Sequence, residues 1–181
     1  MSFTADILPI ISDVMEILQT ELRKNAEAQG HSLTGKLAES IEFEIEESGE
    51  EVIGRMFAED YGSILEVGVR ADRVPFSGKT GTGGTSLYIQ GFIDFWELRG
   101  LSGREAIGAA FATAHVQARE GMPTRASGRF SSTGERTGFI RTTIEQNLDE
   151  IGAIIQNRYG ATLELDFAKS LGQYDKIQFI G

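Results

Sequence analysis

The segment from Leu33 to Phe76 constrains the fold of this chain more than any other. Within it, three apolar residues alternate strictly with three glutamates: Ile41, Phe43 and Ile45 with Glu42, Glu44 and Glu46. A period of two is typical of a strand with one buried face and one solvated face. A second run follows from Glu51 to Met56, so the segment predicts an antiparallel hairpin.

Ser48-Gly49 marks the turn between the two strands. A two-residue loop there predicts three apolar pairs on one face: Ile45 with Val52, Phe43 with Gly54, and Ile41 with Met56. On the other face, this register sets Glu42 opposite Arg55 and Glu46 opposite Glu51. Like charges directly opposite each other are unfavourable. The tip is therefore expected to fray or to meet cations from elsewhere.

Helical periodicity predicts a long amphipathic helix over residues 4 to 29, capped by Thr4 and ended by Gly30. Pro9 indicates a kinked start or a start near Leu8. One apolar stripe runs along this helix: Ile7, Ile10, Ile11, Val14, Ile17, Leu18 and Leu22.

Five further helices are expected. A short one follows the cap Thr34, and another covers 60 to 67 with Tyr61, Ile64 and Leu65 inward. The others cover 87 to 98, 103 to 119 after the cap Ser102, and Thr137 to about Tyr159. The helix over 103 to 119 presents a face of small residues that permits close approach of a neighbouring element: Ala106, Ala109, Ala110, Ala114 and Ala118. The last is expected to bury seven residues: Phe139, Ile140, Ile144, Leu148, Ile151, Ile154 and Ile155.

These patterns predict an α+β fold: an antiparallel hairpin packed against a long N-terminal helix and two or three further helices. We expect one domain over residues 1 to 160 with an arm over 121 to 137, and a C-terminal tail over 161 to 181. The tail fits a strand or a helix, with a short strand expected over 176 to 180.

Charge is unevenly distributed along the chain, whose formal net charge is −10. Residues 39 to 60 carry nine acids against Arg55 alone, whereas residues 121 to 141 carry four arginines against Glu135 alone. An acidic chain is a poor general binder of nucleic acid, because phosphates require a basic footprint. No cysteine is present, which excludes disulfides and thiolate chemistry. No apolar run is long enough to predict a membrane span or a signal peptide.

Motifs of catalysis are incomplete. Gly78-Lys79-Thr80 lacks the first glycine of a phosphate-binding loop, and Gly30-His31-Ser32 lacks the closing glycine of a nucleophile elbow. His31 and His115 have no partner at metal-ligand spacing. Glu59, Asp60 and Glu66 leave open a small acidic hydrolase that uses surface carboxylates. We expect no catalytic residue, no cofactor and no metal.

The order of the pieces resembles the neck and tail-completion proteins of tailed bacteriophages, which join DNA-filled heads to tails. After the long helix, Leu33 to Leu37 and Ser40-Ile41 precede the hairpin. Tyr61 with Glu66-Val67-Gly68 is similar to that family's Y-x-x-x-x-E-x-G segment, and Arg73 to Phe76 is similar to its basic-Pro-Phe exit. Gly138 to Arg141 resembles the F-[LI]-R start of its last helix, although the family usually has proline where this chain has Gly138.

The resemblance implies a structural virion protein, not an enzyme, that forms a homo-oligomeric ring of six or twelve copies. Its implied partners are the portal or connector and the tail proteins, with DNA passing through the ring and no membrane. It implies location in the virion neck or tail, and in the host cytoplasm during assembly. A morphogenesis adaptor of the tail or capsid that forms no ring stays open as an alternative.

The separated charges suggest how copies would join, because a head-to-tail contact that closes makes a ring. We expect the basic arm of one subunit to meet the acidic hairpin of the next through eight residues: Arg125, Arg129, Phe130, Arg136, Glu46, Glu47, Glu50 and Glu51. Glu42 and Glu44 are expected to line the channel, where a negative wall repels DNA phosphates within a Debye length of about 8 Å.

Overall fold

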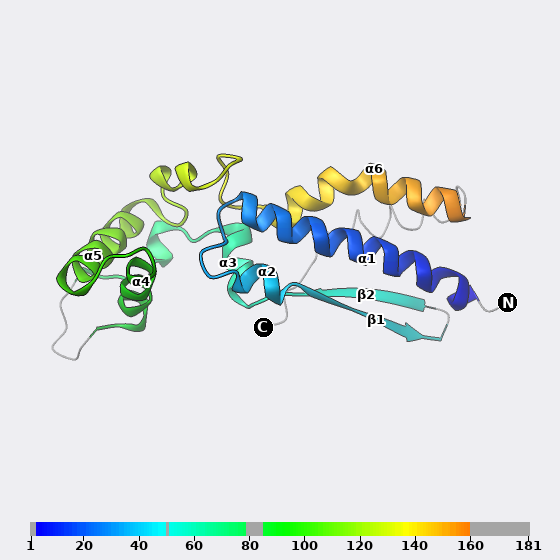
Figure 1. Ribbon diagram of the computed structural model, residues 1–181, viewed down its shortest axis with the longest axis horizontal. Coiled ribbons are helices and arrows are strands. Elements are labelled where there is room, and N and C mark those ends of the chain that lie inside the picture. The colour runs from blue at the N-terminus through cyan, green and yellow to red at the C-terminus, as the bar shows by residue number, and fades with distance from the viewer. Residues whose placement is uncertain (1–2, 50, 79–84, 160–181) are drawn as a thin grey trace. The chain divides into compact units, whose positions relative to one another are not determined.

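The computed structural model describes residues 3–49, 51–78 and 85–159 (Figure 1). It confirms the α+β class, with a long N-terminal helix and a two-stranded antiparallel sheet. The chain divides into two compact units, unit 1 (1–66 with 130–181) and unit 2 (67–129), and the single domain expected over 1–160 stays a prediction. The expected tail, including the strand over 176 to 180, lies outside the described residues.

Helix α1 (Phe3–Ala28) is the central element of unit 1. It continues through Pro9 and begins at Phe3, so the expected cap Thr4 lies inside the helix. Its end confirms the role of Gly30, whose φ is 78°. There His31 N–H donates to Ala26 O at 2.9 Å, and Gly30 N–H donates to Glu27 O at 2.8 Å. This pair of bonds is the Schellman arrangement, which satisfies the last carbonyls of a helix.

Unit 1 has three layers, in which α1 lies between α6 (Phe139–Tyr159) and the hairpin of β1 (Glu42–Ser48) and β2 (Glu51–Phe57) (Figure 1). Two buried clusters hold the layers together. One joins the N-terminal half of α1 to the C-terminal half of α6, through Ile10, Val14, Ile151 and Ile155. The other joins the end of α1 to the short helix α2 (Lys36–Ser40) and to the start of α6, through Leu22, Ala26, Leu37, Ile41 and Phe139.

The hairpin has the predicted faces but a different register. Phe43 pairs with Met56, Ile45 with Gly54 and Glu44 with Arg55. This is a shift of two residues, so every side chain keeps its expected face while the partners change. The shift separates Glu46 from Glu51, and Arg55 instead forms an ion pair with Glu46. The predicted repulsion at the tip is therefore replaced by an attraction.

Gly54 allows the hairpin to lie close to α1. A Cβ atom at this position would lie 2.7 Å from Met15 Sδ and 3.3 Å from Ile11 Cγ2. A side chain here would force either Met15 or β2 to shift, because real Cβ atoms do not approach neighbours so closely. Glycine in a strand interior is typical of such a close approach.

The remaining elements of unit 1 are α2 (Lys36–Ser40) and α3 (Tyr61–Val67). Gly35 is the residue before α2, not the expected cap Thr34, although Thr34 Oγ1 accepts from Lys36 N–H at 3.4 Å. Helix α6 begins at Phe139 after Gly138, whose φ is 75°, and not after the expected cap Thr137.

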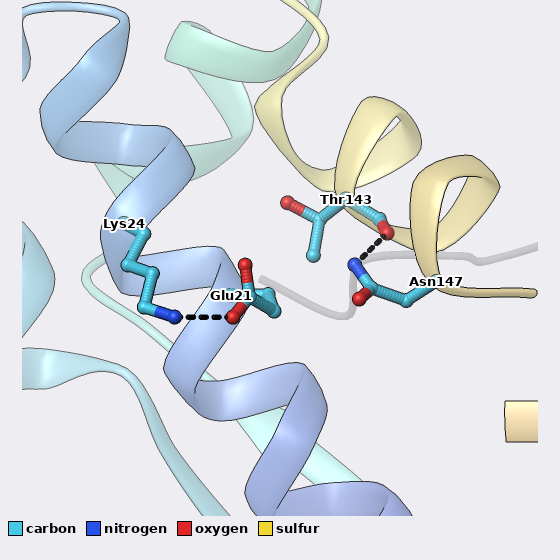
Figure 2. A network of polar contacts seen from close by, with 4 residues as sticks. All are labelled: Glu21, Lys24, Thr143 and Asn147. Carbon is cyan, nitrogen blue, oxygen red and sulfur yellow. Dashed lines mark hydrogen bonds and ion pairs between the residues drawn. The ribbon is translucent and has the colours of Figure 1, made fainter. Parts of the chain in front are cut away.

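Helix α6 buries most of its predicted residues, but Leu148 is 40% exposed, so that prediction was wrong. Its buried face instead includes two polar residues, Thr143 and Asn147. Asn147 Nδ2 donates to Thr143 O at 2.7 Å (Figure 2). Figure 2 also shows the ion pair between Glu21 and Lys24 of α1. Asn25 of α1 also donates to Thr143 Oγ1 at 3.0 Å. Buried polar groups are tolerated because they are paired in this way.

Unit 2 is built on a helical hairpin of α4 (Leu87–Leu98) and α5 (Gly103–Glu120), the two helices predicted over 87–98 and 103–119. The small face of α5 is fully buried at Ala106, Ala110 and Ala114. Trp96 Nε1 donates to Thr113 Oγ1 at 3.0 Å, and Tyr88 donates to Gln117 Oε1 at 2.6 Å. A short 3-10 helix, η1 (Ala71–Arg73), precedes α4, and a bridge between Val69 and Met122 ties the ends of the unit together.

Candidate assembly surfaces

The outer face of the hairpin gathers the glutamates that alternate in the sequence. Glu42, Glu44 and Glu46 are all exposed on this face of β1, and Glu51 of β2 shares it. The expected channel-lining residues and part of the expected interface thus share one surface. Glu47 is exposed near the tip, and Glu50 lies outside the described residues. Arg55 is a cation on this face, but the four glutamates outnumber it, so the charge of the face remains strongly negative.

The basic arm begins with a 3-10 helix, η2 (Arg125–Phe130), where the sequence predicted an irregular loop. Glu120 Oε2 accepts from Arg125 N–H at 3.0 Å, and Thr124 O accepts from Ser127 Oγ at 2.6 Å. These local bonds hold the segment while Arg125 and Arg129 stay exposed. Phe130 is 41% exposed, so η2 presents an aromatic ring together with two guanidinium groups.

The second half of the arm packs on its own unit. Ser132 N–H donates to Ala28 O at 2.8 Å, and a Cβ atom at Gly30 would lie 2.1 Å from Phe130 O and 2.8 Å from Arg136 Nη1. Only glycine fits at position 30. Arg136, which the sequence placed in the subunit interface with Arg125 and Arg129, also takes part in the packing at the end of α1, and its place in the interface stays a prediction.

His31 lies at this junction beside Arg136. Burial lowers the pKa of His31 to about 4, and the nearby positive charge of Arg136 adds to this effect, although a hydrogen bond with the Arg136 backbone opposes it. The imidazole is therefore neutral at pH 7 and packs edge-on against Phe139, with ring centroids 6.2 Å apart. Its role is to close the end of α1 onto α6.

Glu66, a candidate general acid or base, lies at the first turn of α6. Its carboxylate accepts from Ile140 N–H at 2.8 Å and from Arg141 N–H at 3.3 Å, and its backbone carbonyl accepts from Gly138 N–H at 2.8 Å. Free N–H groups at a helix start favour a carboxylate for both hydrogen-bonding and dipole reasons. Glu66 thus joins α3 to α6. Two segments that carry the phage resemblance, the one with Glu66 and the one opening with Gly138, meet here.

The other two candidate acids do not join Glu66. Glu59 and Asp60 are exposed in the turn between β2 and α3, where Glu59 N–H donates to Ser40 Oγ at 3.0 Å. Among the described residues, no group of three His, Asp or Glu side chains is placed to hold a metal ion. No helix of the described part is long and apolar enough to cross a membrane.

The chain was compared with models of protein families, with curated proteins and with solved structures, and none of the three gave a match.

One surface was missed in the sequence. Tyr61 and Ile64 were expected inward, but they are 39% and 47% exposed, and Phe57 at the end of β2 is 46% exposed. Helix α3 turns its other side to the core: Gly62 is buried, and a Cβ atom there would lie 3.5 Å from Leu37 Cδ1. Since Phe57 pairs with Glu42, strand alternation alone could have placed it on the outer face.

Unit 2 has a hollow of about 590 Å³ between α5 and the segment at Phe76. His115 and Arg119 are its titratable lining residues, and His115 stacks edge-on against Phe76 with ring centroids 4.9 Å apart. The lining, as far as the described residues form it, contains no carboxylate.

Proposed function

We propose that the chain is a structural virion protein of a tailed bacteriophage, which assembles into a ring at the head–tail joint or completes the tail. The observation that carries the proposal is that opposite charges belong to different compact units. Unit 1 has 9 Lys and Arg against 22 Asp and Glu, a net charge of −13, whereas unit 2 has 8 against 5, a net charge of +3. A subunit of this kind attracts the next copy head to tail.

The heterologous contact generates a closed ring when its rotation closes. In the proposed ring, Arg125 and Arg129 of one copy meet the acidic surface of unit 1 in the next copy, and Arg136 serves the fold of its own unit. Glu42 and Glu44 face the channel, where their charge keeps the passing DNA from binding. Portal or connector and tail proteins cover the two ends of the ring.

The junction at Glu66 supports the same family. The segments around Glu66 and around Phe139 that resemble the phage family are short, so it is their order along the chain that supports the resemblance. In the fold, the carboxylate of Glu66 binds the first turn of the helix that opens with Phe139. A physical dependence between the two segments explains why they would occur together in proteins that share this arrangement.

The test is a particle image and a solution mass of the purified protein, alone and with a phage connector. The proposal expects a ring of six or twelve copies with a central hole. A monomer that hydrolyses a model ester or glycoside would instead favour the acidic hydrolase, and a monomer or dimer that binds tail proteins without a ring would favour the adaptor.

A further inference from the structure

The surface formed by Phe57, Tyr61 and Ile64, called here the α3 patch, combines exposed apolar area with a negative rim. Its three side chains are 39% to 47% exposed. Glu42 pairs with Phe57 across the hairpin, while Glu59 and Asp60 lie in the turn between Phe57 and Tyr61. An aromatic centre with charges at its edge is the composition typical of the energetically dominant part of an interface.

Tyr61 carries a hydroxyl at the surface of the α3 patch. Its hydroxyl makes no hydrogen bond within the part of the chain that the structure describes. Burial and the charge of Glu59 raise the pKa of Tyr61, so the hydroxyl stays protonated at neutral pH and can donate. The ring of an exposed tyrosine also attracts a guanidinium over its face.

The η2 segment has the complementary chemistry. It presents the partly exposed ring of Phe130 together with the exposed side chains of Arg125 and Arg129. Arg and aromatic residues dominate binding energy where they bury one another. The negative rim of the α3 patch matches these two cations in sign.

The tip of the hairpin is a weaker acceptor for the same segment. Arg55 already pairs with Glu46 there, and both side chains are about half exposed, at 50% and 54%. Ion pairs between exposed side chains contribute little to binding, because water solvates both groups and salt screens them. The tip offers charge, whereas the α3 patch offers charge and apolar area together.

We infer that the α3 patch of one copy is the docking site for the η2 segment of the next copy. This inference rests on the proposed ring assembly and names its contact: Phe130 packs on the rings and aliphatic side chain of the patch, and Arg125 and Arg129 lie toward Glu59 and Asp60. The acidic tip at Glu46 and Glu47 stays outside the contact.

The absence of cysteine from the sequence allows a direct test by cross-linking. Two single-cysteine variants of the full chain, Ile64→Cys and Ala126→Cys, are mixed, assembled and oxidised. Because each chain carries one thiol, a disulfide between the two variants joins two copies. The matched control mixes Glu47→Cys with Ala126→Cys, which probes the hairpin tip instead.

We expect the first mixture to give a linked heterodimer on a non-reducing gel, with at least tenfold more product than the control. Solution mass is measured on the same samples. Assembled particles that link through Glu47→Cys, or through neither position, would overturn the α3 patch while leaving the ring. Samples that stay monomeric by mass would overturn the ring itself, and the docking site with it. Circular dichroism confirms that each variant is folded.

Discussion

The bond between Glu66 and the start of α6 gives the sharpest test of how unit 1 is held together. The change Glu66→Ala removes a carboxylate that accepts from two backbone N–H groups, at 2.8 Å from Ile140 N and 3.3 Å from Arg141 N. It also removes a negative charge at the positive end of a helix of 21 residues. Both losses destabilise the same turn.

The expected magnitude follows from these two effects. Loss of a side-chain cap costs about 1 kcal/mol, and loss of a charge at a helix N-terminus costs about 0.3 to 1 kcal/mol. We expect Glu66→Ala to lower the free energy of unfolding of unit 1 by about 2 kcal/mol. Glu66→Gln keeps one acceptor oxygen without the charge, so it is expected to cost about half as much.

Amide hydrogen exchange measures this effect where it arises. A loss of about 2 kcal/mol should speed exchange at Ile140 and Arg141 roughly 30-fold. The single tryptophan, Trp96, lies in unit 2, so its fluorescence transition in urea should stay unchanged. The control Glu150→Ala removes an exposed acid of α6 and should change stability by at most about 0.5 kcal/mol. Equal effects of the Glu66 and Glu150 changes would refute the capping role.

Three further predictions concern the packing of each unit. His31 has a folded pKa of about 4 against an ordinary 6.5, so it contributes stability above about pH 6.5 that is lost as the pH falls toward 4. After allowance for its partial exposure, we expect His31→Gln to remove about 1 to 2 kcal/mol of the pH dependence measured by urea denaturation at pH 7 and pH 4; identical curves for both proteins would contradict this. Gly30→Ala drives a Cβ atom to 2.1 Å from Phe130 O, whereas Gly49→Ala has the same left-handed backbone strain and open space. Gly30→Ala should therefore cost at least about 1 kcal/mol more than Gly49→Ala by thermal denaturation, and equal costs would show that the arm does not pack there. Ala110→Leu overpacks the contact between α4 and α5 and should cost about 1 to 3 kcal/mol in the Trp96 fluorescence transition, while Ala112→Leu at an exposed position of α5 should leave it unchanged.

Elements with a strong local pattern could be predicted from the sequence. The α4 helix has the bounds that its apolar run indicates, and the small face of α5 is buried as its spacing requires. The end of α1 follows from Gly30, because a left-handed residue there completes the terminal hydrogen bonds. These features depend on residues that are close in the sequence, so the local sequence pattern is enough to predict them.

Features that depend on distant partners could not be predicted in the same way. The hairpin register differs by two residues, because period-two alternation fixes the face of each side chain and leaves its partner open; the observed register separates Glu46 from Glu51. Glu66 was grouped with Glu59 and Asp60 as a candidate acid, since its partners at Ile140 and Arg141 lie more than 70 positions away.

The expected inward placement of Tyr61 and Ile64 was wrong for a related reason, whereas Leu65 packs inward as expected. A helix of seven residues with Tyr61, Ile64 and Leu65 has no single apolar stripe that decides its buried side. Contacts with other elements decide it, because Gly62 lies against Leu37 and Leu65 packs on the buried cluster of unit 1. This packing leaves the side chains of the α3 patch exposed, and the sequence alone does not reveal it.

The most direct test of the central claim, that opposite charges on separate units join copies into a ring, is the solution mass of a charge-reversed variant. Arg125→Glu with Arg129→Glu is compared with Arg104→Glu with Arg119→Glu, which makes the same change of charge elsewhere in unit 2. We predict six- or twelve-fold particles for the unaltered chain and for the control, and a folded monomer of 19.8 kDa for the Arg125 and Arg129 variant. Particles of equal mass in all three samples, or monomers in all three, would contradict the account.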